Sequence, residues 1–212
     1  MTKTSPSMKG RAAEAARNDH KILASARAVF VDDPGAPISA VAKHAGVGIG
    51  ALYNRYESKE VLLQTLAAAS LQRYIDAVEA AVASDGDPWQ VFVAFMHEVV
   101  DTDTQSLAQR LAGTFTPTPG LQQAAERGQK LNIALFERTM NAGVLRRDFT
   151  VGDMSFVLEM VMAIRLPDPE RTRQLRHRYL SLLLDAVHLP DGRPLPGPAP
   201  DWQELAGRWQ KK

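Results

Sequence analysis

The sequence predicts an all-α protein. Through almost every long segment of the 212 residues, apolar residues recur three or four positions apart, as they do along one face of a helix. No segment shows the sustained alternation of apolar and polar residues that is typical of a half-buried strand. With 45% hydrophobic and 23% charged residues, the composition is that of a globular chain whose length allows a sizeable core.

The composition also excludes several classes of protein. The chain contains no cysteine, which excludes disulfides and thiolate metal sites. Its N-terminus lacks the apolar run of a secretory signal, and no stretch approaches the roughly 18 uninterrupted apolar residues of a membrane span. We therefore expect a cytoplasmic protein that makes no membrane contact.

Charge is distributed unevenly along the chain. Residues 1–73 contain ten Lys and Arg against six Asp and Glu, whereas residues 74–212 contain fifteen against eighteen. A basic N-terminal third suits an anionic partner. An excess of four charges is also compatible with an ordinary solvated surface, so charge alone does not decide the partner.

Four helices are expected in the first third of the chain. The first ends before Asp32, the second begins with Pro37-Ile38-Ser39 and is broken at Gly46, and the third covers about Ile49–Arg55. The fourth opens after Ser58, which suits the N-cap position. The apolar face of the first helix consists of Ile22, Leu23, Ala26, Val29 and Phe30.

The rest of the chain predicts further helices separated by proline and glycine. Residues 84–88 (Ser-Asp-Gly-Asp-Pro) end the fourth helix and cap the next, because proline suits the first turn of a helix. From Pro190 on, a Pro/Gly-rich segment predicts an extended tail over the surface. Trp202 and Trp209 are the candidate residues to fasten this tail to the protein. The helices in between are expected to contain Trp89–Met96, Leu107–Leu111, Gln122–Met140, Thr150–Ile164 and Leu175–Val187.

The segment Ala45–Tyr56, A-G-V-G-I-G-A-L-Y-N-R-Y, fits two kinds of phosphate-binding motif. Gly46, Gly48 and Ala51 match the dinucleotide-binding pattern G-x-G-x-x-G/A, which requires a β-strand directly before the first glycine. The preceding residues form a helical pattern instead, for which Ser39 is a good N-cap. This context excludes a dinucleotide, and we expect neither a cofactor nor a metal. The apolar face of that helix consists of Ile38, Val41, Ala42 and Ala45.

The same segment satisfies the requirements of a helix-turn-helix. Two short helices that pack at a steep angle need a small residue in the first, a glycine at the turn and an apolar residue supporting the second. Ala42 and Gly46 meet the first two needs, and Val47 and Leu52 meet the third. Gly46 lies four residues after Ala42 and six before Leu52. Left-handed backbone angles cost glycine little at such a turn. The second helix then presents outward Gly48, Ile49, Gly50, Ala51, Tyr53, Asn54 and Arg55.

The residues around this helix-turn-helix resemble a known family. The segment V-A-K-H-A-G-V-G-I-G-A-L-Y-N-R-Y-E-S-K-E-V-L-L, preceded by K-I-L-A-S-A-R-A-V-F, looks like the DNA-binding domain of the tetracycline-repressor (TetR) family. The resemblance implies a three-helix DNA-binding domain over residues 17–66, followed by a helical ligand-binding and dimerisation domain over residues 67–190. The positions that match the family's spacing are Phe30, Ile38, Ala42, Gly46, Val47, Leu52, Tyr53, Tyr56, Lys59 and Glu60.

The resemblance assigns DNA-binding roles to individual residues. Ser39, Tyr53 and Lys59 stand where the family contacts backbone phosphate, and the positive end of its helix assists Lys59. Such contacts set register and affinity rather than sequence choice. Base reading falls to the recognition helix, at Gly48, Ile49, Gly50, Ala51, Asn54 and Arg55.

Two polar side chains of the recognition helix can read bases directly. Arg55 can donate two hydrogen bonds to guanine and Asn54 can pair with adenine, each worth roughly 1–3 kcal/mol of discrimination. A contact with phosphate alone remains the alternative for both. Because the helix carries few polar groups, DNA shape and contacts with thymine methyl groups are expected to add specificity. Gly50 costs its helix about 0.8–1 kcal/mol relative to alanine but lets the backbone approach DNA closely.

The two ends of the chain are expected to lie outside the helical domains. Residues 1–16 form a flexible basic arm, whose basic residues, counted up to its junction with the first domain, are Lys3, Lys9, Arg11 and Arg17. Contact with phosphate or the minor groove and a solvated tail are the two alternatives for this arm. Residues 191–212 form the Pro-rich C-terminal tail.

The helical domain over residues 67–190 is expected to hold a dimer interface and an effector site. The late apolar helices around Phe156–Ile164 and Leu175–Val187 are candidates for a four-helix interface in a homodimer, with monomer core as the alternative. Methionine and aromatic side chains suit a largely apolar ligand, although their helical spacing also fits a core. The candidate effector residues are Trp89, Phe92, Phe95, Met96, Phe115, Phe136 and Met140.

Together these patterns predict a homodimeric, sequence-specific transcription factor that binds a two-fold symmetric operator in double-stranded DNA. We expect a repressor that a small-molecule effector releases, although the sequence does not distinguish repression from activation. No enzyme is expected, because the His97-Glu98 pair is isolated and belongs to no metalloprotease motif. The alternative function is a helical protein-interaction module that does not bind DNA.

Overall fold

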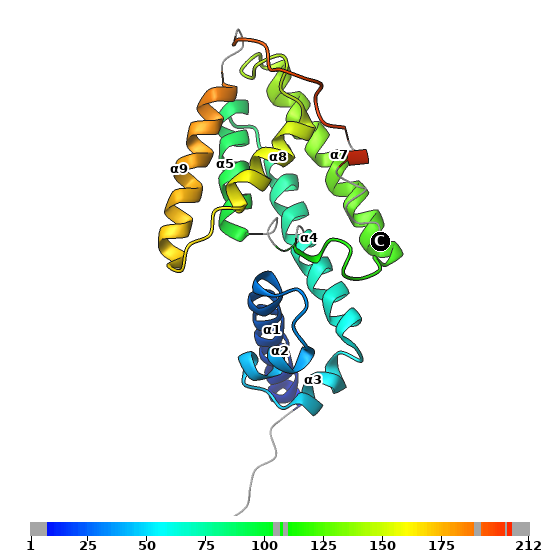
Figure 1. The fold of residues 1–212 in the computed structure, drawn as a ribbon. Helices are drawn as coiled ribbons and strands as arrows, with labels where there is room; N and C mark the ends of the chain where they lie inside the picture. Colours follow the sequence, from blue (N-terminus) through cyan, green and yellow to red (C-terminus); the bar gives the residue numbers. More distant parts are fainter. Residues whose placement is uncertain (1–7, 104–106, 108–109, 189–191, 202, 205–212) are drawn as a thin grey trace, which may run out of the picture. The chain divides into compact units, whose positions relative to one another are not determined.

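The computed structural model describes residues 8–103, 107, 110–188, 192–201 and 203–204, and every regular element among them is a helix (Figure 1). The prediction of an all-α protein is therefore confirmed. None of the helices in these ranges is long and apolar enough to cross a membrane. The helices are α1 (Met8–Asp32), α2 (Ile38–Ala45), α3 (Ile49–Arg55), α4 (Lys59–Ala83), α5 (Pro88–Thr102), α7 (Pro119–Asn141), α8 (Val151–Met162) and α9 (Pro169–Val187).

The chain divides into two compact units, Met1–Leu66 and Ala67–Lys212. Helix α4 begins in the first unit and continues into the second, so one element belongs to both. In the first unit, α1 packs against α2 and α2 against α3. The buried apolar residues of this unit are Ile22, Ala26, Phe30, Ala36, Ile38, Val41, Ala42, Leu52, Tyr56, Leu62, Leu63 and Leu66.

Helix α1 starts earlier than the sequence analysis expects. It begins at Met8, so residues 8–16 are helical where a flexible arm is predicted. Four of those nine residues are alanine, the residue with the highest intrinsic helix propensity. Local propensity thus extends the helix beyond the apolar face on which the prediction relied.

The turn between α2 and α3 has the geometry that the motif requires. Gly46 adopts the left-handed conformation with φ 67° and ψ 30°. The N–H of Gly46 donates to the carbonyl of Lys43 at 3.3 Å, and that of Val47 donates to the carbonyl of Ala42 at 3.0 Å. These bonds satisfy carbonyls that the end of a helix leaves free. Leu52 of α3 is completely buried, as expected for the residue that supports the second helix.

The prediction that Ser39 caps α2 is wrong. The helix begins at Ile38, with Pro37 at the N-cap in an extended conformation and no side-chain hydrogen bond at that position. Ser39 therefore lies within the first turn. The fixed φ of proline suits the entry to a helix, which starts α2 two residues earlier than a serine cap would. The cap at Ser58 is confirmed, because its Oγ accepts a hydrogen bond from the N–H of Val61 at 3.2 Å.

Helix α5 is central to the second unit, where it packs against α7, α8 and α9. Its start is as predicted, with Asp87 accepting a hydrogen bond from the N–H of Gln90 and Pro88 in the first turn. Side chains of α5 form a large buried cluster with residues of α4, α7, α8 and α9. Among those most deeply buried are Val78, Phe92, Met96, Leu135, Met154, Leu158 and Leu180.

Capping side chains set the starts of α7 and α8. Helix α7 begins at Pro119, three residues before the predicted start, because Thr118 caps it. Thr150 is predicted as the first residue of its helix but is instead the N-cap of α8, in a capping box with Asp153. The predicted short helix Leu107–Leu111 lies partly outside the described residues, and its two end residues are buried.

The described part of the C-terminal tail is fastened to the second unit. The N–H of Leu195 donates to Asp148 at 2.7 Å, and Arg146 donates to the carbonyl of Arg193 at 2.6 Å. A β-carbon added at Gly152 would lie only 2.6 Å from the carbonyl oxygen of Pro200, so glycine permits this close approach. Trp202 and Trp209, to which we assigned the docking, lie outside the described residues.

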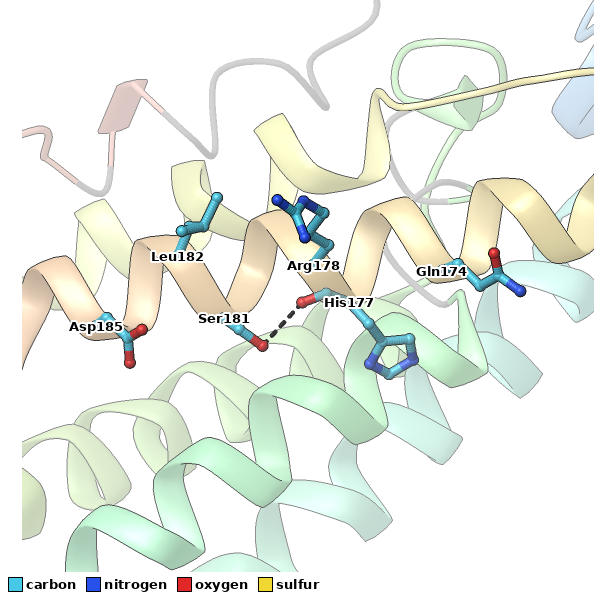
Figure 2. Close-up of a pocket in the computed structure, with 6 residues that line it drawn as sticks. All are labelled: Gln174, His177, Arg178, Ser181, Leu182 and Asp185. Atoms are coloured by element: carbon cyan, nitrogen blue, oxygen red, sulfur yellow. Dashed lines mark hydrogen bonds between the residues drawn. The ribbon is translucent and has the colours of Figure 1, made fainter.

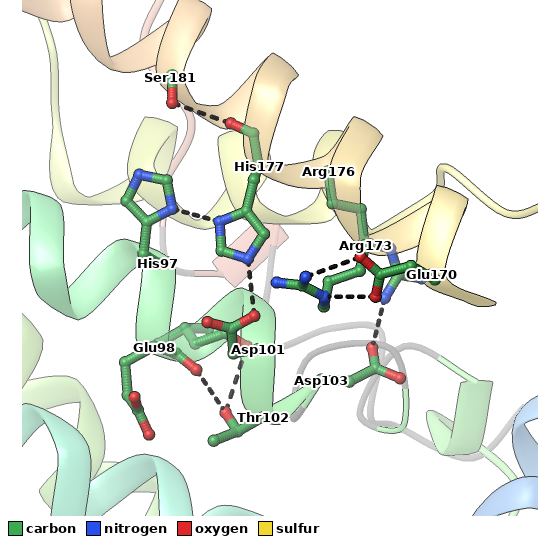
Figure 3. Close-up of polar contacts among 11 residues, drawn as sticks. His97, Glu98, Asp101, Thr102, Asp103, Glu170, Arg173, Arg176, His177 and Ser181 are labelled. Carbon is green, nitrogen blue, oxygen red and sulfur yellow. Dashed lines mark hydrogen bonds and ion pairs between the residues drawn. The ribbon is translucent and has the colours of Figure 1, made fainter.

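Two histidines join α5 to α9. His97 and His177 stack with ring centroids 4.9 Å apart, and their Nδ1 atoms are 2.7 Å apart (Figure 3). A hydrogen bond needs one N–H and one lone pair, so only one of these two nitrogens carries the proton. His177 Nε2 also lies 2.7 Å from Asp101 Oδ1. Burial and the neighbouring His177 lower the pKa of His97, and Asp101 opposes the shift.

We expect acid to weaken this junction. Because the pKa of His97 in the folded protein lies below its ordinary value of 6.5, unfolding takes up a proton between those two values. The contribution of the pair to stability is therefore full above pH 6.5 and is lost as pH falls through the folded-state pKa. Thermal melting at pH 7.5 and 5 should show a larger drop for the wild type than for His97→Asn, which keeps a neutral polar group. Equal drops would contradict this assignment.

Candidate DNA-binding surface

The predicted recognition residues form one exposed surface on α3. Gly48 is the N-cap in an extended conformation, and buried Leu52 fixes the inner side of the helix. Ile49 is 44% exposed and Tyr53 is 47% exposed, which is unusual for large apolar side chains in the first unit. Each of the seven residues expected to face outward is exposed, namely Gly48, Ile49, Gly50, Ala51, Tyr53, Asn54 and Arg55.

Packing inside the chain does not account for the glycines of this surface. A β-carbon added at Gly48 or Gly50 would meet no atom within 4 Å. Glycine inside a helix costs roughly 1 kcal/mol relative to alanine, so Gly50 weakens α3 without relieving a clash. Open space above both residues leaves room for close approach by another molecule.

The two other predicted phosphate contacts differ in their surroundings. Ser39 is exposed in the first turn of α2, where helix N–H groups favour an anion. Lys59, the first residue of α4, has partners within the first unit. Its Nζ donates to the carbonyls of Pro34 at 3.0 Å and Ala36 at 2.7 Å and lies 5.2 Å from the centre of the Phe30 ring. The ammonium group of Lys59 therefore holds the loop between α1 and α2.

Replacing Lys59 should consequently affect folding. Lys59→Met keeps an apolar stem beside Phe30 but removes the donor to two carbonyls, which we expect to lower the free energy of unfolding by about 1–2 kcal/mol. Urea unfolding measures this loss, with Lys43→Met, a change at an exposed lysine of α2, as the control. If Lys59 serves only to contact phosphate, both variants will unfold like the wild type and only DNA affinity will fall.

Arg55 and Tyr56 are joined to α1 through one carboxylate. Arg55 donates from Nε to Asp19 Oδ1 at 2.8 Å and from Nη2 to Asp19 Oδ2 at 2.9 Å. The hydroxyl of Tyr56 donates to the same Oδ1 at 2.5 Å. The hydrogen bond from Arg55 lowers the pKa of Asp19, and the same bond raises the pKa of Arg55. Burial, followed by the bond to Asp19, raises the pKa of Tyr56, so at neutral pH Asp19 and Arg55 are charged and the phenol is neutral.

Sequence reasoning did not identify Asp19. It lies 36 residues before Arg55, on a different helix, and a single acidic residue in a helix carries no signal of a partner so far away. His97 and His177, 80 residues apart, were missed as a pair for the same reason.

The predicted effector residues lie mostly in the core of the second unit. Phe92, Phe95, Met96 and Phe136 belong to the buried cluster, and Trp89 and Met140 pack against it while remaining partly exposed. Phe115 is also buried.

A separate open hollow of about 470 Å³ lies on the outer face of α9 (Figure 2). It is lined by Gln174, His177, Arg178, Ser181, Leu182 and Asp185.

The late helices expose large apolar side chains. Met160 of α8 is 56% exposed, and Leu182 of α9 is 53% exposed. Tyr179, one turn before Leu182 on α9, and Leu166, between the two helices, are exposed as well. The predicted interface helices thus bury one face in the core and leave a second apolar face open.

This fold and its exposed recognition helix define a helix-turn-helix DNA-binding transcriptional regulator. The sequence model of bacterial regulatory proteins of the tetR family matches residues 22–66. This match identifies residues 22–66 as a DNA-binding domain of the tetR family, as the sequence predicted, and the solved structures described next include TetR transcriptional regulators. Members of this family are transcription factors rather than enzymes.

Several solved structures share this fold. A TetR regulator, SCO0520, from Streptomyces coelicolor is 27% identical, with 81% of this chain and 98% of that chain covered and a TM-score of 0.56. A TetR regulator from Mycobacterium vanbaalenii is 23% identical (84% and 98% covered, TM-score 0.54). LfrR from Mycobacterium smegmatis, solved in complex with proflavine, is 20% identical (85% and 99% covered, TM-score 0.61). No curated protein is similar enough to this chain to count as a relative.

Proposed function

We propose that this regulator binds a two-fold symmetric operator through the exposed face of α3. Ser39 and Tyr53 contact phosphate, and the residues that face the bases are Gly48, Ile49, Gly50, Ala51, Asn54 and Arg55. The observation that carries the proposal is the exposure of Ile49 and Tyr53 beside two glycines that no packing requires. Exposed apolar side chains with open backbone between them fit a groove lined by thymine methyl groups.

Electrophoretic or fluorescence binding to the DNA upstream of the protein's own gene tests the proposal. Tyr53→Phe removes only the hydroxyl, and we expect the free energy of DNA binding to weaken by about 1 kcal/mol, or roughly fivefold in affinity. The loss should be equal for all operator variants, because a phosphate contact does not depend on base sequence. Thr65→Val removes a hydroxyl of α4 that donates to the carbonyl of Val61 in the same helix, away from α3 and from the proposed dimer interface, and should bind like the wild type. A wild type that prefers no DNA sequence would contradict the proposed surface.

A homodimer suits this mode of binding. Two recognition helices about 34–36 Å apart can read two half-sites one helical turn apart. We assign the dimer interface to α8 and α9, with Met160, Tyr179 and Leu182 at its centre. Their exposure supports this assignment, because burying apolar area is the main driving force of association.

We further propose that the protein is a repressor and that a largely apolar effector releases it from DNA. The solved structures of similar fold include the proflavine complex of LfrR and a γ-butyrolactone receptor. In this chain the candidate region lies around partly exposed Trp89 and Met140, which border the buried aromatic cluster. Helix α4 offers a covalent route for the signal, since it belongs to both units.

A thermal-shift screen of apolar and aromatic compounds, followed by an operator-release assay, tests the effector proposal. A compound can change operator affinity only if it binds two states of the protein with different affinities. A compound that raises the melting temperature and leaves operator affinity unchanged at saturation would contradict the proposed switch.

A further inference from the structure

We propose that Asp19 determines what Arg55 recognises, by directing its guanidinium to a guanine base and away from phosphate. The inference rests on the proposed binding of DNA by α3. It concerns a residue of α1 that lies outside the helix-turn-helix and that the sequence motif does not include.

Asp19 occupies one edge of the Arg55 guanidinium, and no hydrogen bond joins the edge at the tip to another of the described residues. Asp19 accepts hydrogen bonds from Nε and Nη2 of Arg55, which together form the side edge of the group. Arginine has five N–H donors in a rigid planar fork. The remaining pair at the tip, one from Nη1 and one from Nη2, has the spacing that binds O6 and N7 of guanine.

The orientation of the pair is fixed from both sides. The Tyr56 hydroxyl holds the carboxylate through Oδ1, and the guanidinium carbon of Arg55 lies 5.6 Å from the centre of the Tyr56 ring. The side chain of Asp19 is 25% exposed, whereas that of Arg55 is 59% exposed. Asp19 is thus the more buried partner, and Arg55 is the more exposed one.

Charge favours a base over a phosphate at this tip. The carboxylate of Asp19 neutralises the guanidinium and would repel a phosphate bound to the same group. The acceptors of guanine are uncharged, so they meet little of this repulsion and keep both hydrogen bonds. A guanidinium without its carboxylate partner would instead bind phosphate wherever the DNA presents one, with no dependence on sequence.

The experiment is selection of operators from a random duplex library by the full-length wild type, followed by affinity and salt-dependence measurements on the selected site. Asp19→Asn keeps an acceptor for Tyr56 but removes the charge that holds Arg55. We expect preference for one G·C pair in each half-site to fall by roughly 5- to 100-fold, and the salt slope to steepen by about one per protomer as Arg55 turns to phosphate. Arg55→Ala should lose the preference at the same base pair without the steeper slope.

Glu57→Gln is the matched control. It removes one negative charge from an exposed position two residues after Arg55 and leaves the Asp19 pair intact, so base preference should remain that of the wild type. Melting curves of each variant confirm that it is folded.

Three results would overturn the inference. The first is an Asp19→Asn variant with the base preference of the wild type. The second is an Asp19→Asn variant whose affinity changes equally for all DNA sequences. The third is an Arg55→Ala variant that keeps the preference. Failure of the wild type to select any sequence is a distinct result, which would overturn the proposed function as well.

Discussion

Leu182→Glu is expected to convert the protein to a monomer and to weaken operator binding by about 100-fold or more. Leu182 projects from the outer face of α9 with 53% of its surface exposed, in the region assigned to the dimer interface. A carboxylate there would be buried without a partner in the dimer, at a cost of about 3–5 kcal/mol. A monomer reaches one half-site at a time, so operator affinity falls together with dimerisation.

Light scattering at micromolar concentration measures the change in mass, and fluorescence anisotropy measures operator affinity. Leu195→Glu is the control, because Leu195 is also a large exposed apolar residue of the second unit but lies in the C-terminal tail. It should leave both mass and affinity unchanged. A wild type that is already a monomer, or a Leu182→Glu variant that stays dimeric, would show that the interface lies elsewhere.

Arg176→Ala is expected to destabilise the second unit by about 2–4 kcal/mol. Arg176 is only 9% exposed and joins the ends of two helices (Figure 3). Its Nη2 donates to the carbonyl of Met162 at 3.1 Å and its Nε to that of Ile164 at 3.1 Å. Its Nη1 pairs with Asp103, which ends α5, at 3.2 Å. Truncation leaves these acceptors in a partly buried place without this donor, which costs more than the net value of the bonds.

Urea unfolding followed by circular dichroism measures this loss. Arg173→Ala removes an arginine one turn earlier on α9, where an exposed ion pair with Glu170 is worth less than about 1 kcal/mol. If the two substitutions lower the free energy of unfolding equally, the buried contacts of Arg176 contribute no more to stability than the exposed ion pair of Arg173.

The sequence was most informative where structure depends on local chemistry. The turn glycine at 46 and the proline at 88 act within one helical turn of their own position, so their roles could be inferred from a short segment. The wrong prediction that Ser39 caps α2 also concerned residues within one helical turn of each other. Serine and proline both favour helix starts, and the proline came two residues earlier.

The contacts that define the candidate site in detail depend on tertiary packing. The family resemblance implied a phosphate contact for Lys59 at the start of α4, but its bonds to Pro34 and Ala36 depend on where a loop more than twenty residues earlier folds back. The carboxylate of Asp19 meets Arg55 only once α1 is packed. A periodic pattern identifies which face of a helix is buried but not which polar groups meet across two helices.

The choice of residue at position 152 and the path of the C-terminal tail at Pro200 depend on each other. Because the carbonyl of Pro200 occupies the space that a β-carbon would need, any larger residue at 152 must displace the tail, and a displaced tail removes the need for glycine. Arg146 and the Leu195 N–H hold the pKa of Asp148 at about 2, so the nearby anchor of the tail keeps its charge in moderately acidic solution. In related sequences, a larger residue at position 152 should therefore occur together with changes in the tail residues around Pro200.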